Sequence, residues 1–135
     1  MAFDTLSTRD VPVSDAVLAQ LFTEARSRNG WSDRPVSDDL IRKLYDLTKF
    51  GPTAFNMTPA RLVFVTSSEA KARLIPHMAE GNRAKTLAAP VNLIIGQDID
   101  FHDTLPRLLP HAPGVRDWFL DEAGRREAAF RNASL

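Results

Sequence analysis

The sequence GPTAFNMTPARLVFV, residues 51–65, carries the signal that decides the fold. Gly51, Pro52 and Pro59 interrupt regular structure, so this stretch predicts an ordered loop. The following residues 62–65 are apolar without polar alternation, which is typical of a short strand covered on both faces. We therefore expect a loop that leads directly into a buried β-strand.

A second strand and four helices are predicted around this segment. Residues 91–95 form another short apolar run, which we expect to share one sheet with residues 62–65. Capping residues and apolar periodicity predict helices from Ser14 and Asp15 to near Asn29 and Gly30, from Ser37 to Gly51, from Ser68 to Gly81, and from Asn82 to about Ala88. The predicted order of elements is ααβααβ, within a single domain over residues 1–135.

Apolar residues share one face in each of the first three predicted helices, and we expect the faces of the second and third helices to be buried. These faces consist of Val17, Leu18, Leu21, Phe22 and Ala25 in the first helix, Leu40, Ile41, Leu44 and Leu47 in the second, and Leu74, Ile75 and Met78 in the third.

The last part of the chain is less regular. Pro106, Pro110 and Pro113 predict a mobile or lid-like connection over residues 101–114. A last helix is predicted from about Val115, with a buried side formed by Trp118, Phe119, Ala123 and Phe130. Two short strands form a marginal sheet, and this helix reaches Leu135 without a stop signal. We therefore expect that the chain is part of a larger fold, or that a dimer interface covers the apolar face of the last helix.

Length and composition limit the classes of function. A chain of 135 residues has room for one core. Its 17 Lys and Arg balance 17 Asp and Glu, which disfavours nucleic acid and anionic membranes as partners. The lack of Cys excludes disulfides, thiolate nucleophiles and Cys-ligated metals. Without a long apolar run or a basic signal-peptide start, we expect a soluble, cytoplasmic protein.

Asn82 and Lys85 are the first candidate binding residues. In a helix that begins at Asn82, Arg83 and Lys85 lie in the first turn, where the helix dipole favours anions. Asn82 and Lys85 share a face and together suit an electron-rich heteroaromatic ring or a carboxylate. The alternative is that Asn82 only caps the helix and Lys85 is a solvated surface residue.

Two further segments offer polar groups for a ligand. Arg26 and Ser27 suit a phosphate group, although cations also stabilise the last turn of any helix. The loop at residues 52–56 offers Thr53 and Asn56 to the edge of a flat ligand, or it is simply a turn.

Other kinds of site are poorly supported. Asp98, Asp100, His102 and Asp103 cluster near the second strand but lack the spacing of a metal motif, so we predict no metal site. The sequence contains no dinucleotide-binding, phosphate-loop or nucleophile-elbow motif, and no catalytic side chain is identified.

Four segments, in order, resemble the FMN-dependent nitroreductase family. They are Arg26-Ser27, WSDRPVSDD from Trp31, GPTAFNMTPAR from Gly51 and GNRAKTLAAPV from Gly81. The elements NGW at 29–31, PAR at 59–61 and LPRLLPH at 105–111 resemble in particular the subgroup that contains malonic semialdehyde reductases. The likeness extends through AFRNASL and implies a nitroreductase-like α+β fold, of which this chain holds the N-terminal portion.

The resemblance implies FMN as cofactor and a homodimer with FMN at its interface. Arg26 and Ser27 would meet the phosphate and ribityl end, where Asn29 replaces a basic residue that the family often has. Asn82 and Lys85 would face the pyrimidine side of the isoalloxazine, where charge develops on reduction. The residues expected from the neighbouring subunit are Pro52, Thr53, Ala54 and Asn56.

The implied reaction is hydride transfer from NADH or NADPH to flavin N5 and then to a small acceptor. A nitro compound, a quinone or an aldehyde such as malonic semialdehyde fits this role, and Arg61, Arg107 and Arg116 are candidates for its carboxylate. Two alternatives stay open. One is a non-catalytic remnant that dimerises or binds a polypeptide through Trp118, Phe119 and Phe130. The other is a metal hydrolase that uses residues 98–103.

Overall fold

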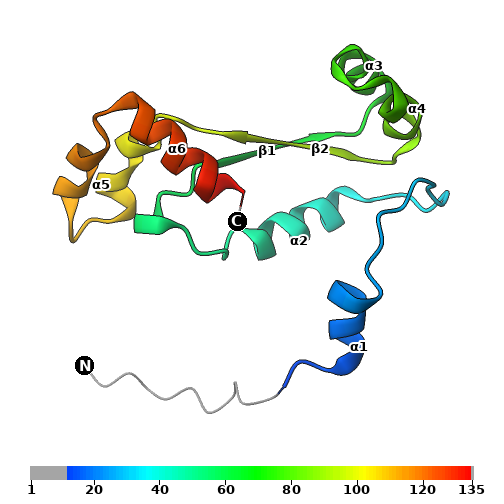
Figure 1. Cartoon of the computed structure of the whole chain (residues 1–135), viewed down its shortest axis with the longest axis horizontal. Helices are drawn as coiled ribbons and strands as arrows, with labels where there is room; N and C mark the ends of the chain where they lie inside the picture. Colours follow the sequence, from blue (N-terminus) through cyan, green and yellow to red (C-terminus); the bar gives the residue numbers. More distant parts are fainter. Residues whose placement is uncertain (1–11, 135) are drawn as a thin grey trace. The chain divides into compact units, whose positions relative to one another are not determined.

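The computed structural model describes residues 12–134, which divide into two compact units between Gly30 and Trp31. The first unit holds one short helix, and the second holds both strands and the remaining helices (Figure 1). None of the helices within residues 12–134 has the length and apolarity needed to span a membrane.

In the first unit, α1 (Asp15–Leu18) continues into a wider π-helical turn at Ala19–Thr23. Ser14 caps α1 as predicted, because its Oγ accepts the backbone N–H of Val17. The helical segment ends before the predicted boundary near Asn29, and Arg26 Nη1 donates to the carbonyl oxygens of Ala25 and Thr23. The apolar face of this helix is exposed within the unit, where Leu21 and Phe22 are 60% and 70% exposed.

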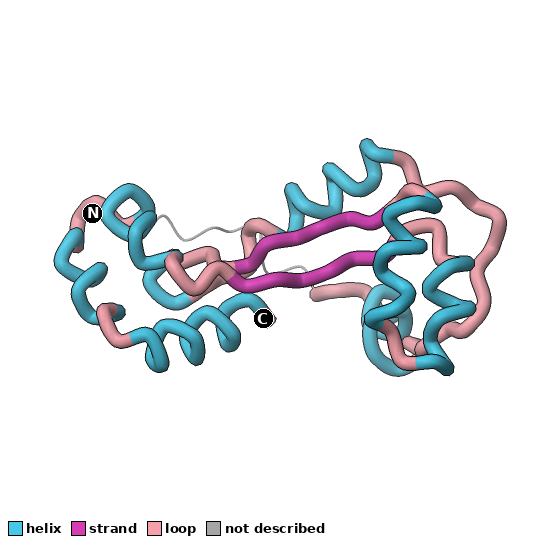
Figure 2. The backbone as a smooth tube through the Cα atoms, turned by 90° about the horizontal axis from the view of Figure 1, so that it is seen from above, coloured by secondary structure: helices cyan, strands magenta, loops and turns pink. Residues whose placement is uncertain are grey.

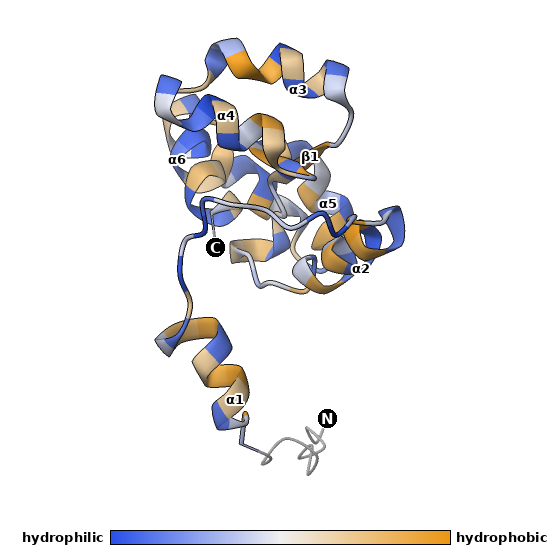
Figure 3. Ribbon diagram, turned by 90° about the vertical axis from the view of Figure 1, so that its right-hand side faces the viewer, coloured by the Kyte–Doolittle hydropathy of each residue, from blue (hydrophilic) through white to orange (hydrophobic). Residues whose placement is uncertain are grey.

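In the second unit, α2 (Asp38–Thr48) confirms the predicted start at Ser37. The Ser37 Oγ accepts the N–H of Leu40 at 3.2 Å, and two aspartates occupy the first turn, where the helix dipole favours them. The expected burial of its apolar face is wrong: Leu40, Leu44 and Leu47 are all exposed, and Ile41 is half-buried. Figure 3 shows apolar residues along α1 and α2.

The two predicted strands form one antiparallel sheet. β1 (Ala60–Val65) pairs with β2 (Asn92–Gln97), and the register runs from Ala60 opposite Gln97 to Val65 opposite Asn92. Figure 2 shows the two strands side by side along their length.

The prediction that both faces of this sheet are covered is wrong. Val65 is buried, but Val63, Leu93 and Ile95 are exposed. In the second unit, α2 runs alongside the strands and the other helices lie at the two ends of the sheet (Figure 1).

At one end, beyond the pairing of Val65 with Asn92, α3 (Ser68–Leu74), a 3₁₀ turn (Ile75–His77) and α4 (Glu80–Ala88) connect the strands. The other end holds α5 (Leu105–Leu108), α6 (Glu122–Ala133) and the 3₁₀ segments Ala54–Asn56, Phe101–Thr104 and Pro113–Phe119.

The hydrophobic core lies at the α5 and α6 end. Its buried members are Met57, Phe101, Leu105, Val115 and Ala129. The predicted lid over residues 101–114 is therefore wrong, because this segment supplies two core side chains. Pro106 lies in the first turn of α5, where a missing N–H costs no helical hydrogen bond.

The last helix, α6, begins at Glu122 rather than near Val115. Asp121 caps it, since its Oδ2 accepts the N–H of Gly124 at 2.7 Å. Of the side chains predicted to be buried, Phe119 is partly buried, whereas Trp118 and Phe130 are 68% and 64% exposed. Ala123 is exposed too, and the buried residue of α6 is Ala129.

Candidate functional site

The start of α4 corrects our reading of its charges. α4 begins at Glu80, so Glu80 lies in the first turn and Lys85 in the last turn. Because the helix dipole favours an anion at the first turn and a cation at the last, Lys85 is well placed, and the predicted mismatch is wrong. Ala79 rather than Asn82 stands at the capping position, and Gly81 lies inside the helix instead of ending α3.

Two hydrogen bonds tie α4 to residues outside it, and a third lies within the helix. The indole Nε1 of Trp31 donates to the carbonyl oxygen of Lys85 at 2.9 Å. Thr86 Oγ1 donates to the Asn82 carbonyl oxygen at 2.8 Å, and Asn92 Nδ2 donates to the Thr86 carbonyl oxygen at 3.0 Å. Asn82 and Lys85 are half-buried, and because they are three residues apart they share a face of this helix, whose last turn is anchored through the Lys85 and Thr86 carbonyl groups.

The loop at residues 52–56 is ordered, as predicted. Thr53 Oγ1 accepts the N–H of Thr58 at 3.1 Å, and the Ala54 carbonyl oxygen accepts the N–H of Met57 at 3.0 Å. Phe55 and Asn56 both have φ of 52°, in the left-handed region that side-chain-bearing residues rarely adopt. Such a conformation persists only where surrounding contacts impose it.

Later parts of the chain supply those contacts. The Ala54 N–H donates to Asn132 Oδ1 on α6 at 2.7 Å, and Asn56 Nδ2 donates to the Leu108 carbonyl oxygen on α5 at 3.3 Å. The ring of Phe55 meets that of Trp118 edge to face, with centroids 5.5 Å apart. The loop is therefore shaped by the same end of the molecule that forms the core.

The α4 residues and the loop lie at opposite ends of the sheet (Figure 1). α4 leads into Asn92, whereas the loop leads into Ala60. The register places these two positions at the two extremes of six paired residues, which corresponds to roughly 17 Å at about 3.4 Å per residue. One copy of the second unit therefore does not bring Lys85 and the loop together.

The predicted phosphate residues belong to the first unit. Arg26, Ser27 and Asn29 are all exposed there, and local carbonyl groups orient the Arg26 guanidinium through Nη1. Their role toward a phosphate stays a prediction.

Two of the three candidate substrate arginines are paired with aspartates. Arg61 pairs with Asp98, and Arg116 Nη2 lies 2.9 Å from Asp103 Oδ1. Arg107 is exposed in the last turn of α5, and no ion pair involves it within residues 12–134. A ligand carboxylate can therefore bind Arg107 without first displacing a protein carboxylate, which is not true of Arg61 or Arg116.

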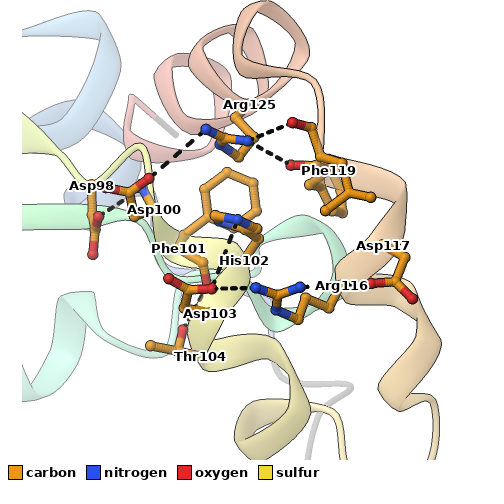
Figure 4. Close-up of polar contacts among 11 residues, drawn as sticks. Asp98, Asp100, Phe101, His102, Asp103, Thr104, Arg116, Asp117, Phe119 and Arg125 are labelled. Atoms are coloured by element: carbon orange, nitrogen blue, oxygen red, sulfur yellow. Dashed lines mark hydrogen bonds and ion pairs between the residues drawn. The ribbon is translucent and has the colours of Figure 1, made fainter.

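The acidic cluster after β2 is neutralised by arginines. Figure 4 shows Asp103 with Arg116 and Asp100 facing Arg125, whose Nη2 lies 3.9 Å from Asp100 Oδ1. In the described part of the chain, no group of three or more His, Asp or Glu side chains is arranged to hold a metal ion.

His102, grouped above with three aspartates, is buried. Sequence reasoning missed two side chains at this end: Arg125 Nη1 donates to the carbonyl oxygens of Phe119 and Leu120, and Asn132 Oδ1 accepts the N–H of Ala54 in the loop. The sequence around each residue shows no signal of these roles, because the contacts depend on tertiary structure.

Known proteins resemble this chain over most of its length. The model of the Nitroreductase family matches residues 9–92. A Caulobacter vibrioides protein, whose name proposes an NADH dehydrogenase/NAD(P)H nitroreductase, is 55% identical over 123 residues, which cover 91% of this chain and 63% of that protein. A Stenotrophomonas maltophilia protein with the same name is 58% identical over 121 residues, covering 89% and 61%.

Solved structures show the same fold. A structure from Exiguobacterium sibiricum, described as a proposed nitroreductase in complex with FMN, superposes with a TM-score of 0.76 at 16% identity and covers 85% of this chain and 63% of that one. The chain thus spans less than two thirds of the length of these relatives. Because the family model matches more than half of the residues of this chain, the chain belongs to the Nitroreductase family and has a nitroreductase-like α+β fold.

Proposed function

We propose that this chain is the FMN-binding part of an NAD(P)H-dependent oxidoreductase that reduces a small organic acceptor. The observation that carries the proposal is the half-buried face of Asn82 and Lys85 on α4, a helix that Trp31 and Asn92 anchor. The names of the relatives from C. vibrioides and S. maltophilia and the FMN complex from E. sibiricum support the choice of nicotinamide and flavin.

The residues of α4 fit the pyrimidine side of a flavin. FMN, when bound, supplies hydride transfer at its N5 atom. Lys85 would place an ammonium group where negative charge develops on the reduced ring, and Asn82 would add a neutral donor and acceptor. Because hydrogen bonds to Trp31 and Asn92 already hold the helix, little ordering is left to be done when the ligand binds.

The loop at residues 52–56 would shape the edge of the flavin site rather than donate hydrogen bonds to the flavin. Ala54 N–H and Asn56 Nδ2 already have acceptors within the chain, and Thr53 Oγ1 already has a donor. Pro52 and Ala54 would then contribute a rigid, mainly apolar contact for the flat ring.

A homodimer would unite the two halves of this site. Since Lys85 and the loop lie at opposite ends of one sheet, the loop of one copy would complete the α4 face of the other. In this arrangement Arg26, Ser27 and Asn29 would serve the phosphate end of FMN.

The acceptor would be a small molecule, and an acidic aldehyde of the malonic semialdehyde type is one candidate. Such an aldehyde needs a cation for its carboxylate. We assign this role to Arg107, because Asp98 and Asp103 already occupy Arg61 and Arg116.

A non-catalytic interaction module is the second candidate function. Trp118 and Phe130 favour it, because both large apolar side chains are mostly exposed in the described structure.

The first test is an FMN titration of the purified chain, followed by flavin fluorescence and by NADH and NADPH oxidation. Saturable binding with FMN-dependent oxidation of either nicotinamide supports the proposed oxidoreductase. Absence of both, in a folded protein that self-associates, favours the interaction module.

A further inference from the structure

The carboxamide of Asn132 joins α6 to the candidate flavin loop. Its Oδ1 accepts the N–H of Ala54 at 2.7 Å, and its Nδ2 donates to the Ala128 carbonyl oxygen at 2.9 Å. Both ends of the amide are used, and its orientation is fixed because only the oxygen accepts and only the nitrogen donates. Asn132 is half-buried and 78 residues away from Ala54 in the chain.

The loop needs such an external contact because of its backbone. Phe55 and Asn56, the two residues after Ala54, have left-handed φ values of 52°. A residue with a side chain is strained in this region, and the conformation persists only where surrounding contacts impose it. The bond to Asn132 fixes Ala54 directly before the strained pair.

We propose that Asn132 is a positioning residue for the FMN site, acting through the Ala54 N–H. This inference rests on the proposed function, in which residues 52–56 meet the flavin. Asn132 itself contacts no ligand in this role. It fixes the loop against α6, so that the loop is ordered before FMN binds and no binding free energy is spent on ordering it.

A double-mutant cycle tests this role in the full chain. Asn132→Ala removes the acceptor, and Ala54→Pro removes the donor. Proline is tolerated at this position, because Ala54 is the first residue of its 3₁₀ segment and Thr53 before it is extended. We expect N132A to weaken FMN binding by about three- to tenfold, the effect of one hydrogen bond. In the A54P background the same substitution is expected to have no further effect.

A second readout needs no flavin. In the flavin-free chain, we expect the Ala54 amide to exchange its hydrogen at least about tenfold faster in N132A than in the wild type. Arg131→Ala is the matched control, because Arg131 is the neighbouring exposed residue of α6 and its side chain pairs with Glu127 alone among residues 12–134. It is expected to change neither amide exchange nor FMN affinity.

The outcomes separate this proposal from the proposed function. If the wild type binds no FMN, both are overturned. If the wild type binds FMN and N132A binds it equally well, only the role of Asn132 is overturned. The same holds if N132A weakens binding equally with and without A54P, or lowers only the unfolding midpoint, because Asn132 then acts as an ordinary structural residue.

Discussion

The indole Nε1 of Trp31 donates a hydrogen bond of 2.9 Å to the carbonyl oxygen of Lys85, 54 residues later in the chain. The same carbonyl oxygen accepts the N–H of Ala89 at 3.0 Å, the hydrogen bond that closes α4. The segment that opens the second unit thereby anchors the end of the helix on which the candidate flavin lysine lies.

Trp31→Phe tests this anchor. The substitution keeps an aromatic ring but removes the donor, so we expect the free energy of unfolding to fall by about 0.5–1.5 kcal/mol. Urea denaturation followed by circular dichroism measures the change. Trp118→Phe is the control, because no hydrogen bond from the Trp118 indole occurs within the described residues. An equal loss in both variants would contradict the anchoring role.

The position of the core predicts different costs for two leucine truncations. Leu105 is 1% exposed and Leu120 is 60% exposed. Leu105→Ala should lower the free energy of unfolding by about 2–5 kcal/mol, since it leaves a cavity. Leu120→Ala should change it by no more than about 0.5 kcal/mol. Similar midpoints for the two variants would show that residues 101–114 form a loose connection after all.

Glu69 predicts a pH effect at the start of α3. Its own backbone N–H, and secondarily the Ser67 side chain, donate to the carboxylate and hold the pKa of Glu69 below the ordinary glutamate value. The resulting stabilisation is present above the pKa of the unfolded chain and is lost as pH falls through the lower folded pKa. The stability difference between wild type and Glu69→Gln should therefore shrink in acid. A carbon NMR titration of the Glu69 carboxyl group at or above its ordinary pKa would contradict this.

Complementation between two defective variants tests whether the site is shared. Lys85→Ala damages the α4 half, and Asn132→Ala damages the loop half. In a shared site, refolding the two together produces heterodimers with one intact site and one doubly damaged site. We expect the mixture to recover tight FMN binding at up to a quarter of all sites, since about half of the dimers are mixed at random assembly. A mixture that binds only as the average of the two variants would place the whole site within one copy.

Local signals predicted the features that depend on local physics. Ser14 and Ser37 cap helices as expected, because a side-chain oxygen that accepts a nearby N–H is visible in the sequence. The start of α4 was missed because Ala79 makes no side-chain cap, whereas Asn82, a residue type common at caps, lies a few residues later. The error reversed the electrostatic reading of Lys85.

Tertiary contacts decided what the sequence pattern could not. The prolines of residues 101–114 indicated a lid, but burial of Phe101 and Leu105 makes this segment part of the core. Likewise, the hydrogen bond between Asn132 and Ala54 joins residues 78 positions apart, and no periodic pattern in the sequence indicates it. The apolar strands predicted covered faces, yet Val63, Leu93 and Ile95 are exposed.

The most direct test of the account is the FMN dissociation constant of the wild type and of Lys85→Ala, with Lys43→Ala as a control that removes an exposed lysine from α2. We predict saturable binding by the wild type, binding at least about tenfold weaker in K85A, as for loss of a hydrogen bond to a charged group, and no change in K43A. Identical affinities of the wild type and K85A, or no binding by the wild type, would contradict the assignment of Lys85 to a flavin site.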